Sequence, residues 1–89
     1  MDAAKLKLYH VKLPEGKLLG YDSYSEFIVS AYNDGEARSY HPSGADNWKY
    51  ARGGWIERER TGELRVELIG IATNNVAPGT VLMALYQSG

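Results

Sequence analysis

The side chains that most often carry chemistry are scarce in this sequence of 89 residues, which has two histidines, His10 and His41, and no cysteine. A catalytic zinc site generally needs three protein ligands, and neither histidine has a second histidine or a carboxylate cluster at metal-binding spacing. The lack of cysteine excludes a thiolate zinc site, a disulfide and a cysteine nucleophile. No serine lies in a Gly-x-Ser-x-Gly motif. We therefore expect no enzymatic activity, no metal, no cofactor, and structural or incidental roles for both histidines.

A second group of residues, between positions 40 and 55, interleaves aromatic rings with cationic side chains. Such rings stack on nucleic-acid bases while the cations neutralise phosphates, but Trp, Tyr and Arg are also the residues that contribute most to protein–protein binding. A third interpretation is that the tryptophans only fold a long surface loop, expected over 42–54, back onto a small core. The candidate binding residues in this segment are Tyr40, Trp48, Tyr50, Arg52 and Trp55.

A third group of candidate residues is the acidic, tyrosine-rich stretch Tyr21-Asp22-Ser23-Tyr24. A tyrosine offers a flat apolar ring with a polar tip, and a nearby acid can pair with Lys or Arg on a partner. The alternative is that these tyrosines lead into a strand and cover the edge of a sheet. We take Tyr21, Asp22 and Tyr24 as candidate partner-binding residues.

The charge of the chain is nearly balanced overall but unevenly distributed. The formal net charge is −1, made up of +2 over residues 1–20, −4 over 21–48, +2 over 49–60 and −1 over 61–89. A general nucleic-acid binder would carry a large basic excess, and a nucleic-acid mimic a large acidic one. The longest apolar run, Val81 to Tyr86, is too short to span a bilayer. We expect one cytoplasmic domain over residues 1–89 that does not bind membranes.

The first half of the chain predicts two strands and one short helix. A strand over 5–13 has apolar residues on both faces, which indicates either that both faces are covered or that a bulge intervenes. Residues 26–32 alternate as a second strand. Asn33 followed by Glu36 is a capping-box pattern that begins a helix. Because Pro42 disfavours helical geometry at the residue before it, this helix is expected over 34–40.

The second half predicts three further strands. Segments 55–60 and 63–72 are expected to form a hairpin around Thr61-Gly62, with Leu64, Val66 and Leu68 on its buried face and alternating charges paired across its wet face. The last strand, 80–87, is apolar on both faces, so it is either central in the sheet or packed against a partner chain. The order β-β-α-β-β-β is that of an α+β domain with one short helix on a small, mostly antiparallel sheet of about five strands.

Several of these segments resemble a family of proteins. The stretches Tyr21-Asp22-Ser23-Tyr24, Glu26 to Ala31, Asn33 to Arg38 and Val66 to Ala72, together with the apolar last strand, are similar to small accessory proteins of bacteriophages and prophages. The shared motifs are structural, namely a strand leading into a capped helix and the later strands, and they include no catalytic residues. Segment 40–55, with both tryptophans, departs from the family pattern.

The resemblance implies a non-enzymatic inhibitor of a bacterial defence complex, such as an anti-CRISPR protein acting in the infected host. Proteins of that class bind a CRISPR effector and occlude its working surface. In this interpretation Tyr21, Asp22 and Tyr24 contact basic residues of the partner, while the 40–55 segment supplies the aromatic anchors. The alternative is a small nucleic-acid or nucleotide-binding module that uses the loop 48–55. The protein would be a monomer or a homodimer, and the apolar last strand suggests that it could instead be a self-associating structural protein.

Overall fold

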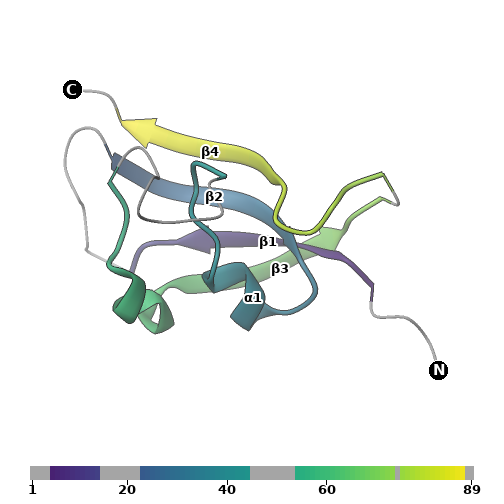
Figure 1. Ribbon diagram of the computed structural model, residues 1–89, viewed down its shortest axis with the longest axis horizontal. Coiled ribbons are helices and arrows are strands. Elements are labelled where there is room, and N and C mark those ends of the chain that lie inside the picture. Colours follow the sequence, from purple (N-terminus) through teal and green to yellow (C-terminus); the bar gives the residue numbers. More distant parts are fainter. Residues whose placement is uncertain (1–4, 15–22, 45–53, 74, 88–89) are drawn as a thin grey trace.

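Four antiparallel strands form one sheet in the order β3-β1-β2-β4 (Figure 1). The computed structural model describes residues 5–14, 23–44, 54–73 and 75–87. The strands are β1 (Lys7–Lys12), β2 (Ser23–Ala31), β3 (Arg65–Ile71) and β4 (Val81–Gln87). A short helix, α1 (Asp34–Arg38), and a 3-10 helix, η2 (Arg58–Glu63), complete the described elements. The expected α+β class with an antiparallel sheet is confirmed, with four strands rather than about five.

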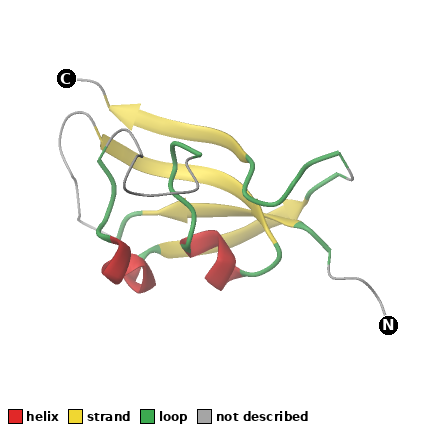
Figure 2. Ribbon diagram, in the orientation of Figure 1, coloured by secondary structure: helices red, strands yellow, loops and turns green. Residues whose placement is uncertain are grey.

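Both helices lie on the same face of the sheet (Figure 2). Alternate residues of the two central strands point toward them, and these side chains form the core with residues that the helices and connecting segments supply. No described helix covers the opposite face. The buried core residues are Tyr9, Val11, Leu13, Phe27, Val29, Ala31, Ala37, Ile56 and Leu64.

Helix α1 begins as the capping box predicts. The Asn33 side chain accepts a hydrogen bond from the Glu36 backbone N–H at 2.8 Å, and the Glu36 carboxylate accepts one from the Tyr32 N–H at 3.4 Å. The helix ends at Arg38 rather than at the predicted residue 40, because Ser39 turns the chain with a tight bond from its N–H to the Glu36 carbonyl. Helix α1 is therefore little more than one turn long.

The predicted strand over 55–60 is wrong, because residues 58–63 form η2 instead. The charges that we expected to pair across a hairpin pair locally: the Arg60 guanidinium donates two hydrogen bonds to the Glu63 carboxylate, at 2.7 and 2.8 Å. Ile56 and Leu64 are buried at the two ends of this segment, whereas residues 57–59, 62 and 63 are exposed. With no alternating apolar residues between these anchors, the segment has no face to bury as a strand.

Arg38 connects the two helices. Its guanidinium donates hydrogen bonds to the carbonyls of Thr61 and Gly62, at 3.3 and 3.2 Å, and to the carbonyl of Leu64. These acceptors lie at the C-terminal end of η2, where the Thr61 carbonyl also accepts a hydrogen bond from the Leu64 N–H at 3.1 Å and the last carbonyls of a helix generally need partners from outside it. One side chain of α1 therefore satisfies the end of η2 and holds both helices over the sheet.

The two edge strands differ from what their patterns predict. Leu64 is buried and Val66 is half-buried, as expected, but Leu68 is 55% exposed because β3 is an edge strand. The bulge that was one of our two expectations for residues 5–13 does not lie in that strand, because the register of β1 with β2 is unbroken. A bulge lies in β3 instead: Leu8 pairs with Gly70 and Tyr9 with Leu68, so Ile69 is the extra residue.

Strand β4 is not central in the sheet, which was one of our two expectations, since β2 is its one neighbour among the described strands. Its apolar composition is therefore not explained by pairing on both sides. The beginning of the expected surface loop 42–54 is also different, because Pro42 is fully buried. The other residues of that loop, apart from Ser43, Gly44 and Gly54, lie outside the described part of the chain.

Hydrogen bonds to Ser30 stabilise the turn that leads into β4. The Ser30 hydroxyl donates to the Ala77 carbonyl at 2.6 Å and accepts from the Thr80 N–H at 2.9 Å, while the Gly79 N–H donates to the Ser30 carbonyl at 2.8 Å. Gly79 has a φ of 81°, and a Cβ at this position would lie 2.9 Å from the Tyr40 ring. The turn thus needs glycine both for its backbone conformation and for its approach to Tyr40.

We expect Gly79→Ala to lower the free energy of unfolding by more than the roughly 1–2 kcal/mol that a left-handed backbone costs a non-glycine residue. The matched control is Gly44→Ala, because Gly44 has a φ of 84° but a methyl group at that position would meet no heavy atom within 4 Å. Urea unfolding of the two variants measures the difference. Equal losses would show that Tyr40 does not restrict this turn.

Candidate protein-binding surface

Three of the eight predicted binding residues lie in the described part of the chain, namely Tyr24, Tyr40 and Trp55. These three side chains occupy different surroundings. The remaining five predicted binding residues lie outside the described residues, and they are Tyr21, Asp22, Trp48, Tyr50 and Arg52.

The described ends of the two predicted binding segments meet at the beginning of β2. Ser23 and Gly54 form a parallel bridge, and the Tyr24 N–H donates to the Gly54 carbonyl at 2.8 Å. Ser23 lies within the tyrosine-rich segment, and Gly54 lies near the end of the aromatic and cationic one. The fold therefore joins, at one end of the sheet, two segments that the sequence separates by about thirty residues.

Trp55 is a packing residue. Its ring meets the Phe27 ring edge-to-face, with centroids 5.5 Å apart, and Phe27 is fully buried. The indole N–H of Trp55 is buried and has no hydrogen-bond partner among the described residues. Since this contact uses the ring to cover the core, the interpretation in which the tryptophans fold the loop inward is the one that the geometry of Trp55 supports.

Tyr40 also has a structural environment. Its hydroxyl donates to the Glu36 carboxylate at 2.9 Å, and its ring lies against Gly79 in the turn before β4. It is half-buried and packs against the core. Tyr40 therefore connects α1 to the turn before β4.

Tyr24 is the predicted residue whose environment fits a binding role. Its ring packs against that of Tyr86, with centroids 4.9 Å apart, and against that of His41, with centroids 6.0 Å apart. Tyr24 is half-buried, and Tyr86 is 46% exposed. Two tyrosine rings from β2 and β4 thus form a partly exposed aromatic pair at the end of the sheet where the two predicted segments meet.

His41 supports this pair through its contact with Tyr24. It is only 4% exposed, and its Nδ1 accepts a hydrogen bond from the Ser43 N–H at 3.1 Å and lies 2.8 Å from the Ser43 hydroxyl. Burial lowers the pKa of His41 below its ordinary value of 6.5, because the surrounding protein disfavours the charged ring. The structural role expected for this histidine agrees with its position against Tyr24.

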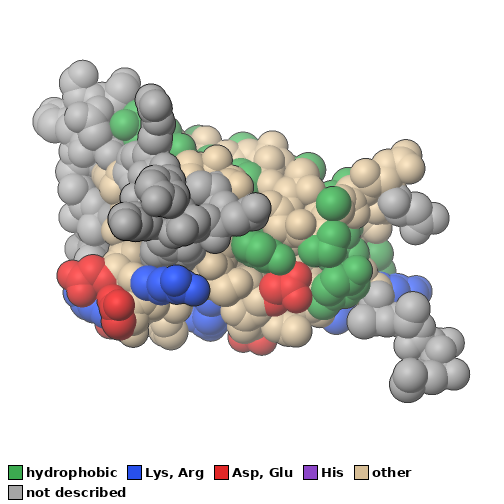
Figure 3. Space-filling model, viewed as in Figure 1, with side chains coloured by type: hydrophobic (Ala, Val, Ile, Leu, Met, Phe, Trp, Pro, Cys, Tyr) green, Lys and Arg blue, Asp and Glu red, His purple; other side chains and the backbone are tan. Residues whose placement is uncertain are grey.

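Sequence reasoning found only part of a second surface feature, the exposed apolar side chains of the edge strands: it noted the apolar last strand but expected Leu68 to be buried. A signal for it was present, because residues 68–89 contain no charged residue, but which strands form the edges depends on long-range pairing. Figure 3 shows the helix-bearing face, where charged side chains gather over α1 and η2. The exposed large apolar residues of the edge strands are Leu68, Ile69 and Ile71 on β3, and Leu82, Met83, Leu85 and Tyr86 on β4.

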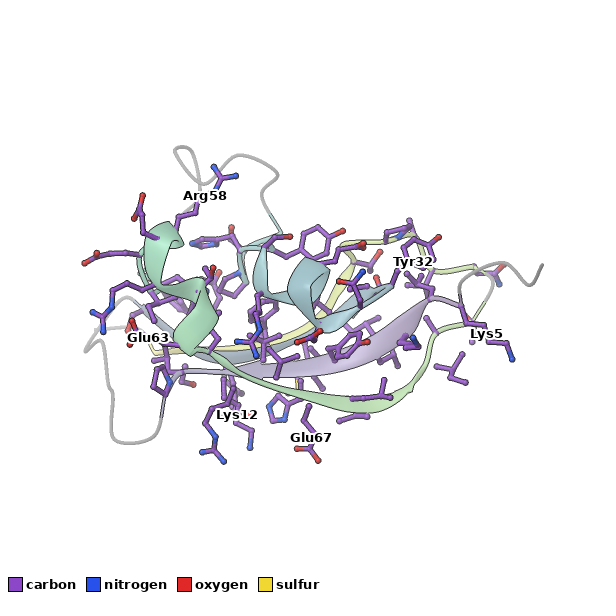
Figure 4. The ribbon with its side chains drawn as sticks, turned by 90° about the horizontal axis from the view of Figure 1, so that it is seen from below. Lys5, Lys12, Tyr32, Arg58, Glu63 and Glu67 are labelled. Carbon is purple, nitrogen blue, oxygen red and sulfur yellow. The ribbon has the colours of Figure 1, made fainter. Side chains whose placement is uncertain are left out.

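The face of the sheet opposite the helices carries charged residues along its centre. The His10 Nε2 and a Glu26 carboxylate oxygen are 2.7 Å apart, joining β1 to β2. Lys12 lies opposite both Glu26 and Arg65, and it borders a shallow hollow of about 130 Å³ with Arg65, Val66 and Glu67. Figure 4 shows Lys12 and Glu67 pointing away from the helices.

Two further observations bear on function. Among the described residues, no group of three or more histidine, aspartate or glutamate side chains is arranged to hold a metal ion. No described helix is both long enough and apolar enough to cross a membrane.

Comparison with protein-family models, with curated proteins and with solved structures finds no match to this chain. A function must therefore be inferred from the surface and the sequence themselves.

We expect Trp55→Ala to destabilise the protein by about 3 kcal/mol, because it removes a large ring from the core beside Phe27. Trp55→Phe should cost less, since it keeps an aromatic ring and removes the unpartnered N–H. Chemical unfolding at neutral pH measures both losses. A Trp55→Ala variant as stable as the wild type would contradict the packing role and return Trp55 to the candidate binding residues.

We expect the stability that the neutral His41 ring contributes to be complete above about pH 6.5 and to be lost as the pH falls through the lowered pKa of the folded state. The sign follows because the unfolded chain binds a proton at His41 more readily than the folded chain. Urea unfolding from mildly basic to mildly acidic pH should show a smaller decrease for His41→Asn, whose amide oxygen can still accept from Ser43. Identical pH dependence in the two proteins would rule out this contribution.

Proposed function

We propose that this protein is a small binding protein that inhibits a bacterial defence complex through protein–protein contact rather than catalysis. In this proposal it is encoded by a phage or prophage and acts in the cytoplasm of the infected cell. Its partner is a CRISPR effector, and the mechanism is occlusion of a surface that the effector needs.

The observation that carries the proposal is the Tyr24–Tyr86 pair. The two rings lie 4.9 Å apart and are partly exposed, so they present a rigid apolar surface with polar tips. Tyrosines of this kind contribute strongly to binding because they lose little conformational entropy when they are covered. The acidic Asp22, two positions before Tyr24 in the sequence, is the residue proposed to contact basic groups of the partner.

The choice of partner depends on the sequence resemblance. The segments that resemble phage accessory proteins include Tyr21 to Tyr24, so the aromatic pair lies in a part of the chain that carries the resemblance. Proteins of the anti-CRISPR class act stoichiometrically and need no catalytic residues. A surface built from tyrosines and acids fits an effector, since effectors hold nucleic acid in basic channels.

The nucleic-acid alternative has less support from the described residues. Of the loop 48–55, the described aromatic residue is Trp55, and its ring packs on Phe27 instead of being available to stack on a base. That alternative therefore depends on Trp48, Tyr50 and Arg52, which lie outside the described residues.

The proposal predicts that the purified protein captures a type I or type II CRISPR effector and that its expression protects a targeted phage in a plaque assay. Tyr24→Ala should weaken capture by about tenfold or more, as expected for a central aromatic residue of an interface. The matched control is Tyr32→Ala, because Tyr32 is 38% exposed and lies just past the opposite end of β2. It should bind as the wild type does, and circular dichroism should show that both variants are folded.

Two results would contradict the proposal. The first is the absence of any complex together with the absence of phage protection. The second is binding of labelled single-stranded nucleic acid that weakens with salt and is lost in Arg52→Ala, which would favour the nucleic-acid module instead.

A further inference from the structure

Strand β4 is an edge strand without charged residues or proline, although a bulge at Leu82 interrupts its ladder with β2. Among the described strands it is hydrogen-bonded to β2 alone, so alternate N–H and C=O groups of its backbone point away from that sheet. Proteins usually protect an exposed edge with lysine, other charges or proline. Strand β4 has none of these, and four of its seven residues are exposed and large: Leu82, Met83, Leu85 and Tyr86.

Charged residues occur on both central strands and on the edge strand β3, whereas the edge strand β4 has none. The two central strands carry His10, Lys12 and Glu26 on the face away from the helices, whereas residues 68–89 contain no charged residue at all. In a monomer the charges would be expected at the edges, where they prevent pairing with another chain. The arrangement instead keeps charge away from β4 and leaves that edge able to pair.

We propose that a second copy of this chain pairs with β4 in antiparallel orientation, around a two-fold axis at Ala84. This register places Met83 opposite Leu85 of the second copy, and Leu85 opposite its Met83. Met83 and Leu85 are thus matched to one another by the symmetry itself, which is the condition for a closed two-fold interface.

The faces of the strand agree with this register. Met83 is paired with Ile28, and Leu85 with Glu26, so both lie on the face of the sheet away from the helices. Two-fold pairing at Ala84 would join Met83 and Leu85 of both copies into one apolar cluster on that face, continuous with Ile28. Ala84, which packs against the core from the other face, is small enough to lie opposite itself at the axis.

Strand β4 is a better site for pairing with a second copy of the chain than the other edge strand, β3. Both edge strands contain a bulge, at Ile69 in β3 and at Leu82 in β4, so the bulges do not distinguish them. Strand β3 also carries Arg65 and Glu67, and charges on an edge strand hinder its pairing with another chain. Pairing of β4 with itself brings no charge opposite another charge, and it removes the apolar edge from both copies in one closed assembly.

The experiment is the measurement of molar mass by light scattering after size-exclusion chromatography, over a range of concentrations. The expected mass is twice the 9.9 kDa of one chain. Met83→Glu should shift the protein to the monomer mass, because the charge would be placed in the interface between the two strands. The matched control is Ile69→Glu, a similarly exposed apolar residue of the opposite edge, which should leave the dimer intact.

The register is tested by a double variant. In Met83→Glu/Leu85→Lys, the two-fold pairing places each glutamate opposite a lysine of the other copy, so the dimer should return and should weaken as salt is added. A wild-type protein that is monomeric at every concentration would overturn the proposal. Loss of the dimer in Ile69→Glu but not in Met83→Glu would also overturn it, because the interface would then be β3. Failure of the double variant to dimerise would overturn the register at Ala84.

Discussion

The packing of Phe27 is the contact on which the rest of the structure depends. Phe27 lies in the middle of β2 and is fully buried, opposite Val11 of β1 and Ala84 of β4. The Trp55 ring meets its edge. A single large ring thus joins three strands of the sheet to the segment before η2, on the face that the two short helices cover.

The parts of the fold that are determined by neighbouring residues could be predicted, and those determined by distant ones could not. The cap of α1 needs only Asn33 and Glu36, which are three residues apart, and it forms as the sequence indicates. The predicted strand over 55–60 failed because Arg60 finds its partner, Glu63, within the same turn. The burial expected for Leu68 failed because a strand's position at the edge of a sheet is set by pairing across the whole chain.

The same distinction applies to the candidate site. The sequence identified Tyr24 by its residue type and acidic surroundings, but its partner Tyr86 comes from the last strand, about sixty residues later. Tyr40 and Trp55 have the composition of binding residues and are used in packing, because a small domain has few other large rings with which to cover its core. Composition could therefore identify aromatic residues as candidates for binding. The strand order is needed to distinguish the aromatic residues that are exposed from those that pack against the core.

The order of the strands has a consequence for how the molecule opens. Strands β1 and β2 pair with each other at the centre, while β3 and β4 each make one ladder and lie at opposite edges. Either outer strand can separate without breaking the ladder of the other, so partial opening requires much less energy than global unfolding. The β2–β4 ladder is further interrupted by two shifts in register, between Tyr24 and Glu26 and between Ile28 and Val29. The protein thus has a graded stability across its width, greatest at the central ladder and declining toward each margin.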